Sequence, residues 1–368
     1  MSDLFSEMNI RNMRVKNRIV MPPMVCFGWA GEEGLVTENN VKHYKARAKG
    51  GVGLIIVEAT CVSRNGRLAD RQLGLWSDAQ IEGFSQIARE CHQYGARVLV
   101  QIHHAGLATP RSVSNDRVAP SEYEGQSNIR ELNLSARALT IKEIKAIQTD
   151  FIAAAVRAKK AGLDGIELHG AHGYLISQFF SPFVNQREDS YGGNLEGRTR
   201  FATELIAGIR NVTGEDFIIG CRMGSNEPDL QTGIKIAQRL EKSGIDVLHI
   251  STGMTTFIKT NSTESQSVPP DFKYNWIVYG GTQIKRNVKV PVIVVNGIRT
   301  PEQANYLIKH NLSDFVALGK GLLVDPEWAN KAQRKQNVTA CIDCKACAYF
   351  RPGTVCPQQE LGRKNAAS

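Results

Sequence analysis

Short apolar runs rich in β-branched residues recur along the chain, and most are followed by a longer stretch with apolar residues every three or four positions. The first pattern predicts buried strands and the second predicts amphipathic helices. We expect strands at Arg18–Met21, Gly53–Glu58, Arg97–Ile102, Gly165–Leu168, Phe217–Arg222, Val247–Ile250, Pro291–Val295 and Asp314–Leu318. We expect helices at Asn39–Lys49, Asp78–Tyr94, Ile141–Ala161, Arg198–Val212, Thr232–Ser243 and Pro301–His310. Between the sixth and seventh strands, Met254–Tyr274 is irregular and no helix is assigned.

This alternation predicts an α/β fold built as one (β/α)8 TIM barrel. The units run from about residue 18 to about residue 330, which suits a barrel of ~250 residues with insertions. An open doubly wound sheet would place the glycine string G-x-G-x-x-G after its first strand, and the chain contains no such string. We expect a barrel over residues 1–335 and a short cysteine-rich extension over residues 336–368.

Composition and charge predict where in the cell the protein is located and which kinds of partner it binds. The 368 residues are 42% hydrophobic and 22% charged, as in an ordinary globular protein. Apolar runs such as Leu54–Val57 are far shorter than the ~20 residues of a membrane span, and the N-terminus lacks a secretory signal. We therefore expect a cytoplasmic protein. The net charge of +9 is spread along the chain without a basic block, so a nucleic-acid partner is not favoured.

The residues that follow the strands carry the candidate chemistry, because a barrel places its active site at the carboxyl ends of its strands. Polar and cationic groups gather there: Gln101, His103 and His104 on strand three, His169, His172 and Tyr174 on strand four, Arg222 on strand five, Ser251 on strand six, Asn296-Gly297 after strand seven and Gly319-Lys320 after strand eight. The last two strands of a barrel commonly end in a phosphate site, which Gly297, Gly319 and Lys320 fit. Alternatively, the two glycines are ordinary turn residues.

Six separated motifs make a detailed match to a known family. They are Met21-Pro-Pro-Met24, Gly53-Leu-Ile-Ile-Val-Glu-Ala59, Gln101-Ile-His-His-Ala-Gly106, His169-Gly-Ala-His-Gly-Tyr-Leu175, Asn185-Gln-Arg-Glu-Asp-Ser-Tyr-Gly-Gly-Asn194 and Gly319-Lys320. In this order, from about Leu4 to Ala329, the chain resembles the old yellow enzyme family of FMN-dependent ene-reductases.

The resemblance implies an enzyme that takes hydride from NAD(P)H through FMN and reduces the C=C bond of an α,β-unsaturated carbonyl or similar activated alkene. It implies that Pro23, Met24, Ala59, Gln101 and Arg222 line or hydrogen-bond the flavin ring, and that Gly297, Gly319 and Lys320 hold the phosphate. Lys320 replaces the more usual arginine, which keeps the charge but loses the bidentate geometry. A homo-oligomer and a small unsaturated substrate are expected, and the long loops Ala108–Ser135 and Thr255–Tyr274 would choose that substrate.

His169 and His172 match the pair that binds the substrate carbonyl oxygen, and Tyr174 matches the proton donor. Two donors would polarise the enone and stabilise negative charge on its oxygen. A phenol keeps its proton at neutral pH and can still deliver it to the α-carbon. The His-x-x-His spacing also suits a metal site, although the string offers no third carboxylate ligand. A purely structural histidine pair is a further alternative.

Four cysteines cluster after the barrel, at Cys341, Cys344, Cys347 and Cys356. The first three have the C-x2-C-x2-C spacing of iron–sulfur ligands, and Cys356 is followed by a proline as in that motif. The tail is similar to that of the 2,4-dienoyl-CoA reductase and trimethylamine dehydrogenase branch, although the later spacings are shorter here. A [4Fe-4S] cluster, a zinc ion and a remnant without metal stay open. With a cluster, a partner protein could deliver electrons to FMN.

Two other functions remain as alternatives. A flavin barrel similar to the tRNA-dihydrouridine synthases would need a catalytic cysteine after strand three or four, where His104 and Tyr174 stand instead. A non-redox phosphate-binding barrel, such as an aldolase or isomerase, would need a strand-end lysine or a glutamate base. Glu58 and Glu167 lie on strands and could serve, but the residues at the barrel mouth contain no obvious base.

Overall fold

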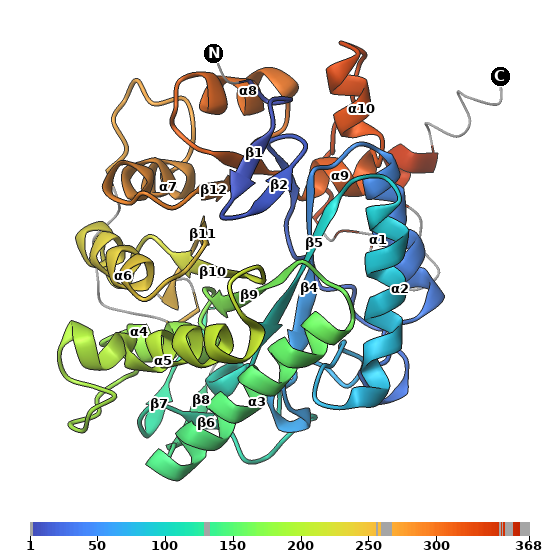
Figure 1. Ribbon diagram of the computed structural model, residues 1–368. Coiled ribbons are helices and arrows are strands. Elements are labelled where there is room, and N and C mark those ends of the chain that lie inside the picture. Colours follow the sequence, from blue (N-terminus) through green and yellow to red (C-terminus); the bar gives the residue numbers. More distant parts are fainter. Residues whose placement is uncertain are drawn as a thin grey trace.

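Eight parallel strands close into a barrel, as the sequence predicts (Figure 1). A computed structural model describes residues 3–128, 133–254, 257–258, 267–345, 347, 349 and 356–360. The barrel strands follow one another in chain order, and the last pairs with the first: β3 (Ile19–Met21), β4 (Leu54–Cys61), β5 (Arg97–His103), β9 (Gly165–Gly170), β10 (Ile218–Gly224), β11 (Val247–Ser251), β12 (Val292–Val295) and β13 (Phe315–Ala317). All eight predicted strands are confirmed, with shifts of at most three residues at their ends.

Helices surround the barrel and shield its outer face (Figure 1). They are α1 (Glu38–Lys49), α2 (Ile81–His92), α3 (Ile141–Lys160), α4 (Leu175–Phe180), α5 (Leu195–Thr213), α6 (Leu230–Lys242), α7 (Trp276–Asn287), α8 (Pro301–Lys309), α9 (Lys320–Val324) and α10 (Trp328–Gln333). Local sequence sets several helix starts. Before α3, Thr140 accepts a hydrogen bond from the Glu143 amide, and the Glu143 side chain accepts one from the Thr140 amide. This capping box satisfies two amides that would otherwise lack partners.

Four helices were not predicted from the sequence, namely α4, α7, α9 and α10, and for α7 and α4 the reasons are physical. Helix α7 begins after Asn275, whose side chain caps the amides of Ile277 and Val278. Its interior holds Gly280 and Gly281, which weaken the helical signal. A Cβ on Gly281 would meet the Val294 side chain at 2.6 Å, so the glycine lets the helix approach β12 closely. Helix α4 is buried along its whole length and therefore has no amphipathic period.

The amino-terminal end of the barrel is plugged by a hairpin of β1 (Met8–Ile10) and β2 (Met13–Val15). Its side chains Ile10, Met13 and Val15 join the apolar interior of the barrel, which includes Leu99 and Ile218. The interior is thus closed at this end. A ligand can therefore reach the interior from the opposite end, where the strands terminate.

A small cap lies over the open end. It contains β6 (Val118–Ala119), β7 (Tyr123–Gly125) and β8 (Leu134–Ala138), all within the long segment after β5. Phe257 and Ile258, from the segment after β11, pack into the same apolar cluster, which Tyr174 also contacts. The Asn128 amide donates to the Phe257 carbonyl over 2.9 Å. The two predicted substrate loops therefore meet, although residues 129–132, 255–256 and 259–266 lie outside the described residues.

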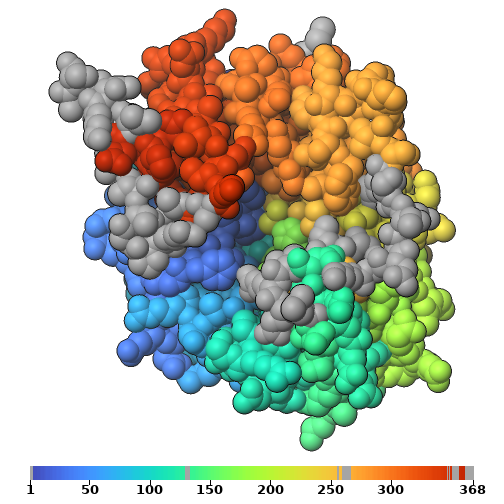
Figure 2. Space-filling view, turned by 180° about the vertical axis from the view of Figure 1, so that it is seen from behind, coloured from blue at the N-terminus to red at the C-terminus, as the bar shows by residue number. Residues whose placement is uncertain are grey.

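The face opposite to the one seen in Figure 1 is hollowed near its centre, with red residues of the C-terminal segment at the rim (Figure 2). This segment leaves the barrel after α10, whose Trp328 is buried. Within the described part of the chain, no helix has both the length and the apolar composition required for a membrane span.

Candidate functional site

A β-bulge on β4 aims Ala59 into the barrel. The pairing of β4 with β5 shifts register between Val57 and Thr60. Ile56 lies in the interior cluster and Val57 in the outer one, so strict alternation would turn residue 58 inward and Ala59 outward. The extra residue reverses this order, and Glu58 instead faces α1. The bulge thereby places a small side chain where the predicted flavin ring would lie.

Glu58 fixes the loop that carries Pro23 and Met24. Its carboxyl group accepts hydrogen bonds from the Cys26 amide at 2.7 Å, from Asn40 at 3.2 Å and from the Tyr44 hydroxyl at 3.2 Å. Burial raises the pKa of Glu58 to about 7, against the opposing effect of these donors. This loop follows β3 directly, so the contacts hold Pro23 and Met24 at the barrel mouth.

Below the mouth, three inward side chains form a polar layer. Gln101 donates its Nε2–H to Glu167 Oε1 at 2.7 Å, and His249 Nδ1 lies 2.8 Å from Glu167 Oε2. All three residues are buried. Gln101 was expected here by resemblance, whereas His249 was not. The signal was present in the period of two along β11, which turns Val247, His249 and Ser251 to the same side.

Arg222, Ser251 and His172 form the next layer toward solvent. Arg222 Nη2 donates to Ser251 Oγ at 3.3 Å, and Ser251 Oγ lies 2.7 Å from His172 Nε2. Arg222 Nε is buried and has no hydrogen-bond partner among the described residues. His249 Nε2 lacks a partner in the same way. Buried polar atoms rarely stay unpaired, so these two atoms fit a bound polar ring at this position.

His169, His172 and Tyr174 come together as predicted. The ring centroids of His169 and Tyr174 are 4.6 Å apart, and those of His169 and His172 are 5.1 Å apart. The backbone turn between them needs positive φ angles of 59° at His172 and 77° at Gly173. A side chain on Gly173 would also clash with Phe257 at 2.4 Å. The glycine in this motif is therefore required to bring the histidine pair next to the tyrosine.

Burial keeps both histidines neutral. It lowers the pKa of His169 and of His172 well below the usual value, and the Arg222 charge acts in the same direction. A neutral imidazole offers one N–H donor without a charge. The Ala171 amide donates to His169 Nδ1 at 3.4 Å, which leaves Nε2–H as the free donor in this tautomer. His169 can thus act as an uncharged donor through Nε2–H, and His172 can do so through Nδ1–H when Ser251 Oγ donates to its Nε2.

His103 also belongs to this cluster, although the sequence indicated no specific role for it. Its ring lies 5.3 Å from that of Tyr174 and 6.1 Å from that of His169. Gln72 donates to His103 Nε2 at 2.6 Å and to the Ala59 carbonyl at 2.7 Å, so the proton of His103 is on Nδ1. Burial lowers the pKa of His103 to about 3. His103 therefore supplies a further neutral donor beside Tyr174.

The alternative of a metal at the histidine pair is not supported by the geometry. Across the described residues, no group of three or more His, Cys, Asp or Glu side chains is arranged to hold a metal ion. Ser251 and Tyr174, rather than a third ligand, neighbour the two histidines.

Gly297, Gly319 and Lys320 line one cavity of about 320 Å³ at the ends of β12 and β13. Gly297 has a φ of 71°, which a side chain would strain. Lys320 differs from the simple expectation because its side chain is exposed and its Nζ donates to Asp343 Oδ1 at 2.7 Å. Arg299 pairs with the same carboxylate. Two cations thus lie beside this cavity, where a single lysine was expected.

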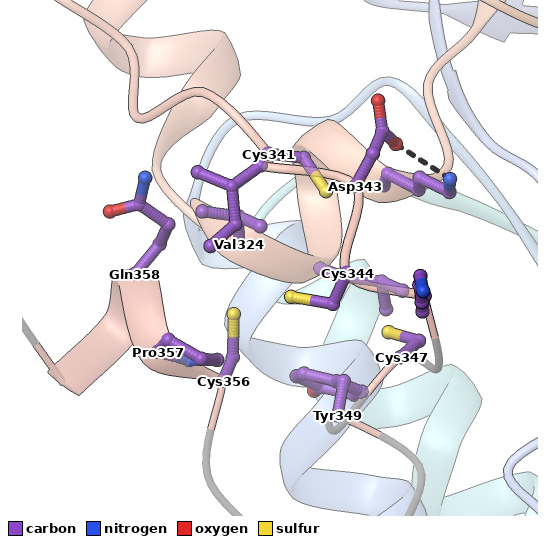
Figure 3. A pocket seen from close by; sticks show the side chains of 13 residues that line it. Val324, Cys341, Asp343, Cys344, Cys347, Tyr349, Cys356, Pro357 and Gln358 are labelled. Atoms are coloured by element: carbon purple, nitrogen blue, oxygen red, sulfur yellow. Dashed lines mark hydrogen bonds and ion pairs between the residues drawn. The ribbon is translucent and has the colours of Figure 1, made fainter.

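The four cysteines of the C-terminal segment line a second cavity, of about 230 Å³. Figure 3 shows Cys341, Cys344, Cys347 and Cys356 around this space together with Tyr349. None of them is in a disulfide. The thiols are not close enough for the single tetrahedral ion that a preformed zinc site would need, since no such group exists among the described residues. Among the described residues, the cysteines therefore show no assembled metal site.

The two cavities share Lys320 and Cys341. Tyr349, beside the cysteines, is held by α1, because its hydroxyl lies 2.7 Å from His43 Nδ1 and accepts from Arg47 at 3.0 Å. The C-terminal segment therefore forms one wall of the predicted phosphate site.

Glu227 is a buried carboxyl group close to the turn that carries His172 and Tyr174. Its Oε1 accepts hydrogen bonds from Ser177 on α4 at 2.5 Å and from the Met254 amide at 2.7 Å, while Oε2 has no partner among the described residues. Burial raises the pKa of Glu227 to about 8. No sequence signal distinguishes this residue.

We expect Glu227 to make the protein less stable as the pH rises from 4.5 to 8. Its pKa rises from 4.5 to about 8 on folding, so its contribution is complete below pH 4.5 and is lost as the pH rises through 8. The free energy of unfolding should fall by about 1.4 kcal/mol per pH unit over this range through this one group. Urea titrations between pH 5 and 8.5 should show a flatter dependence for Glu227→Gln. The exposed control Glu188→Gln should keep the wild-type slope, and an equal slope in both variants would contradict the assignment.

Comparisons with known proteins identify relatives of this chain. The sequence profile of the NADH:flavin oxidoreductase / NADH oxidase family matches residues 3–338. The chain is 44% identical to an NADH oxidase from Thermoanaerobacter brockii over 93% of its own length, but spans only 52% of that relative. It is 37% identical to an NADPH dehydrogenase from Clostridium acetobutylicum, covering 91% of this chain and 96% of the relative. The solved old yellow enzyme homologue from Zymomonas mobilis is 27% identical with a TM-score of 0.79, covering 97% and 98% of the two chains.

Proposed function

Because the chain belongs to the NADH:flavin oxidoreductase / NADH oxidase family, we propose that it uses FMN and NAD(P)H to reduce the C=C bond of an α,β-unsaturated carbonyl or similar activated alkene. Membership places it among the NAD(P)H-dependent flavin oxidoreductases. The chain spans about half the length of the first relative above, so the activity of the whole protein is part of this proposal.

The residues at the mouth fit FMN. Gln101 and the unpartnered Arg222 Nε supply the hydrogen bonds that a flavin pyrimidine edge requires, while Pro23, Met24 and Ala59 provide apolar contact. Gly297, Gly319 and Lys320, with Arg299 nearby, would hold the phosphate. When bound there, FMN supplies the hydride that it takes from NAD(P)H.

The observation that carries the proposal is the grouping of His169, His172 and Tyr174 above Arg222. The two imidazoles donate hydrogen bonds to the substrate carbonyl oxygen, because burial keeps them neutral and each retains one N–H. They thereby stabilise negative charge on that oxygen as the β-carbon is reduced. Tyr174 holds a proton that it delivers to the α-carbon, which completes the addition of two hydrogens.

The experiment that tests this function is an anaerobic absorbance titration. The purified protein, loaded with FMN, should show flavin bands that bleach with NADPH or NADH and return when an enone such as 2-cyclohexenone is added. A protein that fails to take up FMN would refute the proposal and favour the non-redox barrel.

His169→Ala should weaken the binding of a phenol, which mimics the charged oxygen of the substrate intermediate. The loss of one donor to an anionic oxygen should raise the phenol dissociation constant roughly 10²-fold. The measurement is the long-wavelength absorbance of the phenol complex with FMN-loaded protein. His310→Ala, on the surface of the barrel beyond α8, is the control and should bind phenol like the wild type. Undiminished binding by His169→Ala would remove His169 from this role.

We also infer that the four C-terminal cysteines hold an iron–sulfur cluster rather than one ion. The observations are that all four line one cavity of about 230 Å³, and that their C-x2-C-x2-C spacing, with a proline after Cys356, is that of iron–sulfur ligands. A cluster of several iron and sulfide ions needs a wider space between its thiolates than zinc, whose Zn–S bonds are about 2.3 Å. Such a cluster would let a partner protein deliver electrons to the barrel. Homo-oligomer formation and a cytoplasmic location stay predictions.

A further inference from the structure

The polar layer inside the barrel is centred on Glu167, which the proposed reaction does not use. Its side chain is 1% exposed, and each carboxyl oxygen accepts one hydrogen bond, from Gln101 and from His249. Two residues earlier on neighbouring strands the interior is apolar, at Leu99 and Val247. Glu167 therefore places a carboxylate between an apolar core and the ligand-binding mouth, where an unpaired charge would be strongly unfavourable.

A glycine on β10, Gly220, leaves room for this layer. Glu167 lies on β9 and His249 on β11, so the two are separated by β10. The β10 residue paired with Glu167 is Gly220. A Cβ there would already meet the Val247 side chain at 3.1 Å, and a longer side chain would fill the space between Glu167 and His249. Gly220 thus allows a hydrogen bond across an intervening strand.

Glu167 fixes which end of the Gln101 amide faces the mouth. A glutamine amide can turn by 180° with little change in shape, exchanging a donor for an acceptor. Because Glu167 accepts from Gln101 Nε2, the donor end is engaged. Gln101 Oε1 makes no hydrogen bond among the described residues and is left as the acceptor. The mouth then presents an acceptor from Gln101 and a donor from Arg222 Nε, the pattern that a ring with adjacent N–H and carbonyl groups requires.

The charge of Glu167 acts on the same site. Arg222 is buried, which lowers its pKa, while Glu167 raises it by electrostatic attraction. Arg222 favours negative charge on a ring bound against it, and Glu167 opposes that effect through the low-dielectric interior. The two side chains therefore have opposite effects on a ligand whose charge changes during reaction.

We propose that Glu167 is a positioning residue for the flavin ring, which orients Gln101 toward the ring and offsets the charge of Arg222. This inference rests on the proposed binding of FMN. Reduction adds negative charge to the flavin ring, so removal of the Glu167 charge should favour the reduced form. The hydrogen bond to Gln101 should instead govern how tightly and in which orientation the oxidised ring binds.

Two substitutions separate these effects. Glu167→Gln keeps the shape and one acceptor oxygen but removes the charge. Glu167→Asp keeps the charge but shortens the side chain, so that it no longer reaches both Gln101 and His249. The exposed Glu188→Gln is the control for loss of one negative charge elsewhere. Each protein is stripped of flavin and titrated with FMN, and the loaded form is equilibrated anaerobically with a redox dye.

Glu167→Gln should shift the equilibrium toward reduced flavin by roughly tenfold, the size expected of one buried charge interaction. Glu167→Asp should leave that equilibrium near the wild-type value, raise the FMN dissociation constant roughly tenfold, and change the circular dichroism of the bound flavin. Glu188→Gln should match the wild type in all measurements. If one Glu167 variant fails to fold, the other still decides its own half of the proposal.

An unchanged redox equilibrium in Glu167→Gln would overturn the charge role. Unchanged affinity and circular dichroism in Glu167→Asp would overturn the positioning role. These outcomes differ from failure of the proposed function, in which the wild-type protein itself would not bind FMN and the inference would fall with it.

Discussion

Tyr174→Phe should slow alkene reduction about 10²–10⁴-fold while reduction of the bound flavin by NAD(P)H stays near the wild-type rate. The substitution removes the hydroxyl and its proton but keeps the ring, which packs against His169 and His103. Binding geometry should therefore survive. The two half-reactions are measured separately by stopped-flow absorbance, first with NADPH and then with an enone added to the reduced enzyme.

The control for this experiment is Tyr306→Phe, which removes a hydroxyl from the exposed face of α8. It should leave both half-reactions unchanged. An equal loss in the two half-reactions of Tyr174→Phe would mean that the tyrosine shapes the flavin site rather than donating a proton. A rate of alkene reduction equal to the wild type would transfer the proton-donor role to another group, for which His103, with its ring 5.3 Å from that of Tyr174, is a candidate.

The strand order could be predicted from the sequence because each strand of a barrel repeats the same local pattern. Apolar runs such as Val292–Val295 are short, β-branched and fully buried, so their signal does not depend on distant contacts. The residues at the strand ends followed from this order, and the structure brings His169, His172, Tyr174 and Arg222 together as expected.

Other features depend on contacts between distant segments and leave no local signal. The bulge that turns Ala59 inward is defined by the pairing of β4 with β5. The contact of Glu167 with His249 depends on Gly220, a residue that in sequence looks like an ordinary strand glycine. The pairing of Lys320 with Asp343 joins the end of β13 to the C-terminal segment. Sequence spacing could identify the four cysteines, but it could not show that they line one cavity next to the predicted phosphate site.

The cysteine cavity gives the second large expected effect. Cys344→Ala should abolish bound iron and acid-labile sulfide, whereas the wild type, purified without oxygen, should contain about four iron atoms per chain if the cluster is [4Fe-4S]. Cys344 and Cys347 are exposed in the structure, and Cys341 and Cys356 are half-buried, so the thiols can be reached by iron during assembly. Loss of one of four ligands should suffice, because the remaining three thiolates leave one iron without a protein ligand.

Cys91→Ala is the matched control, since Cys91 is a buried cysteine of α2 far from the tail in the chain. It should retain full iron, sulfide and FMN. Cys344→Ala should also retain FMN, because the ring-binding residues lie on β4, β5 and β10 inside the barrel. Iron retained at the wild-type level in Cys344→Ala, or one zinc ion per wild-type chain in place of iron, would contradict the cluster. Because Cys341 and Lys320 line both cavities, a fall in FMN affinity in Cys344→Ala would instead show that the tail also supports the phosphate site.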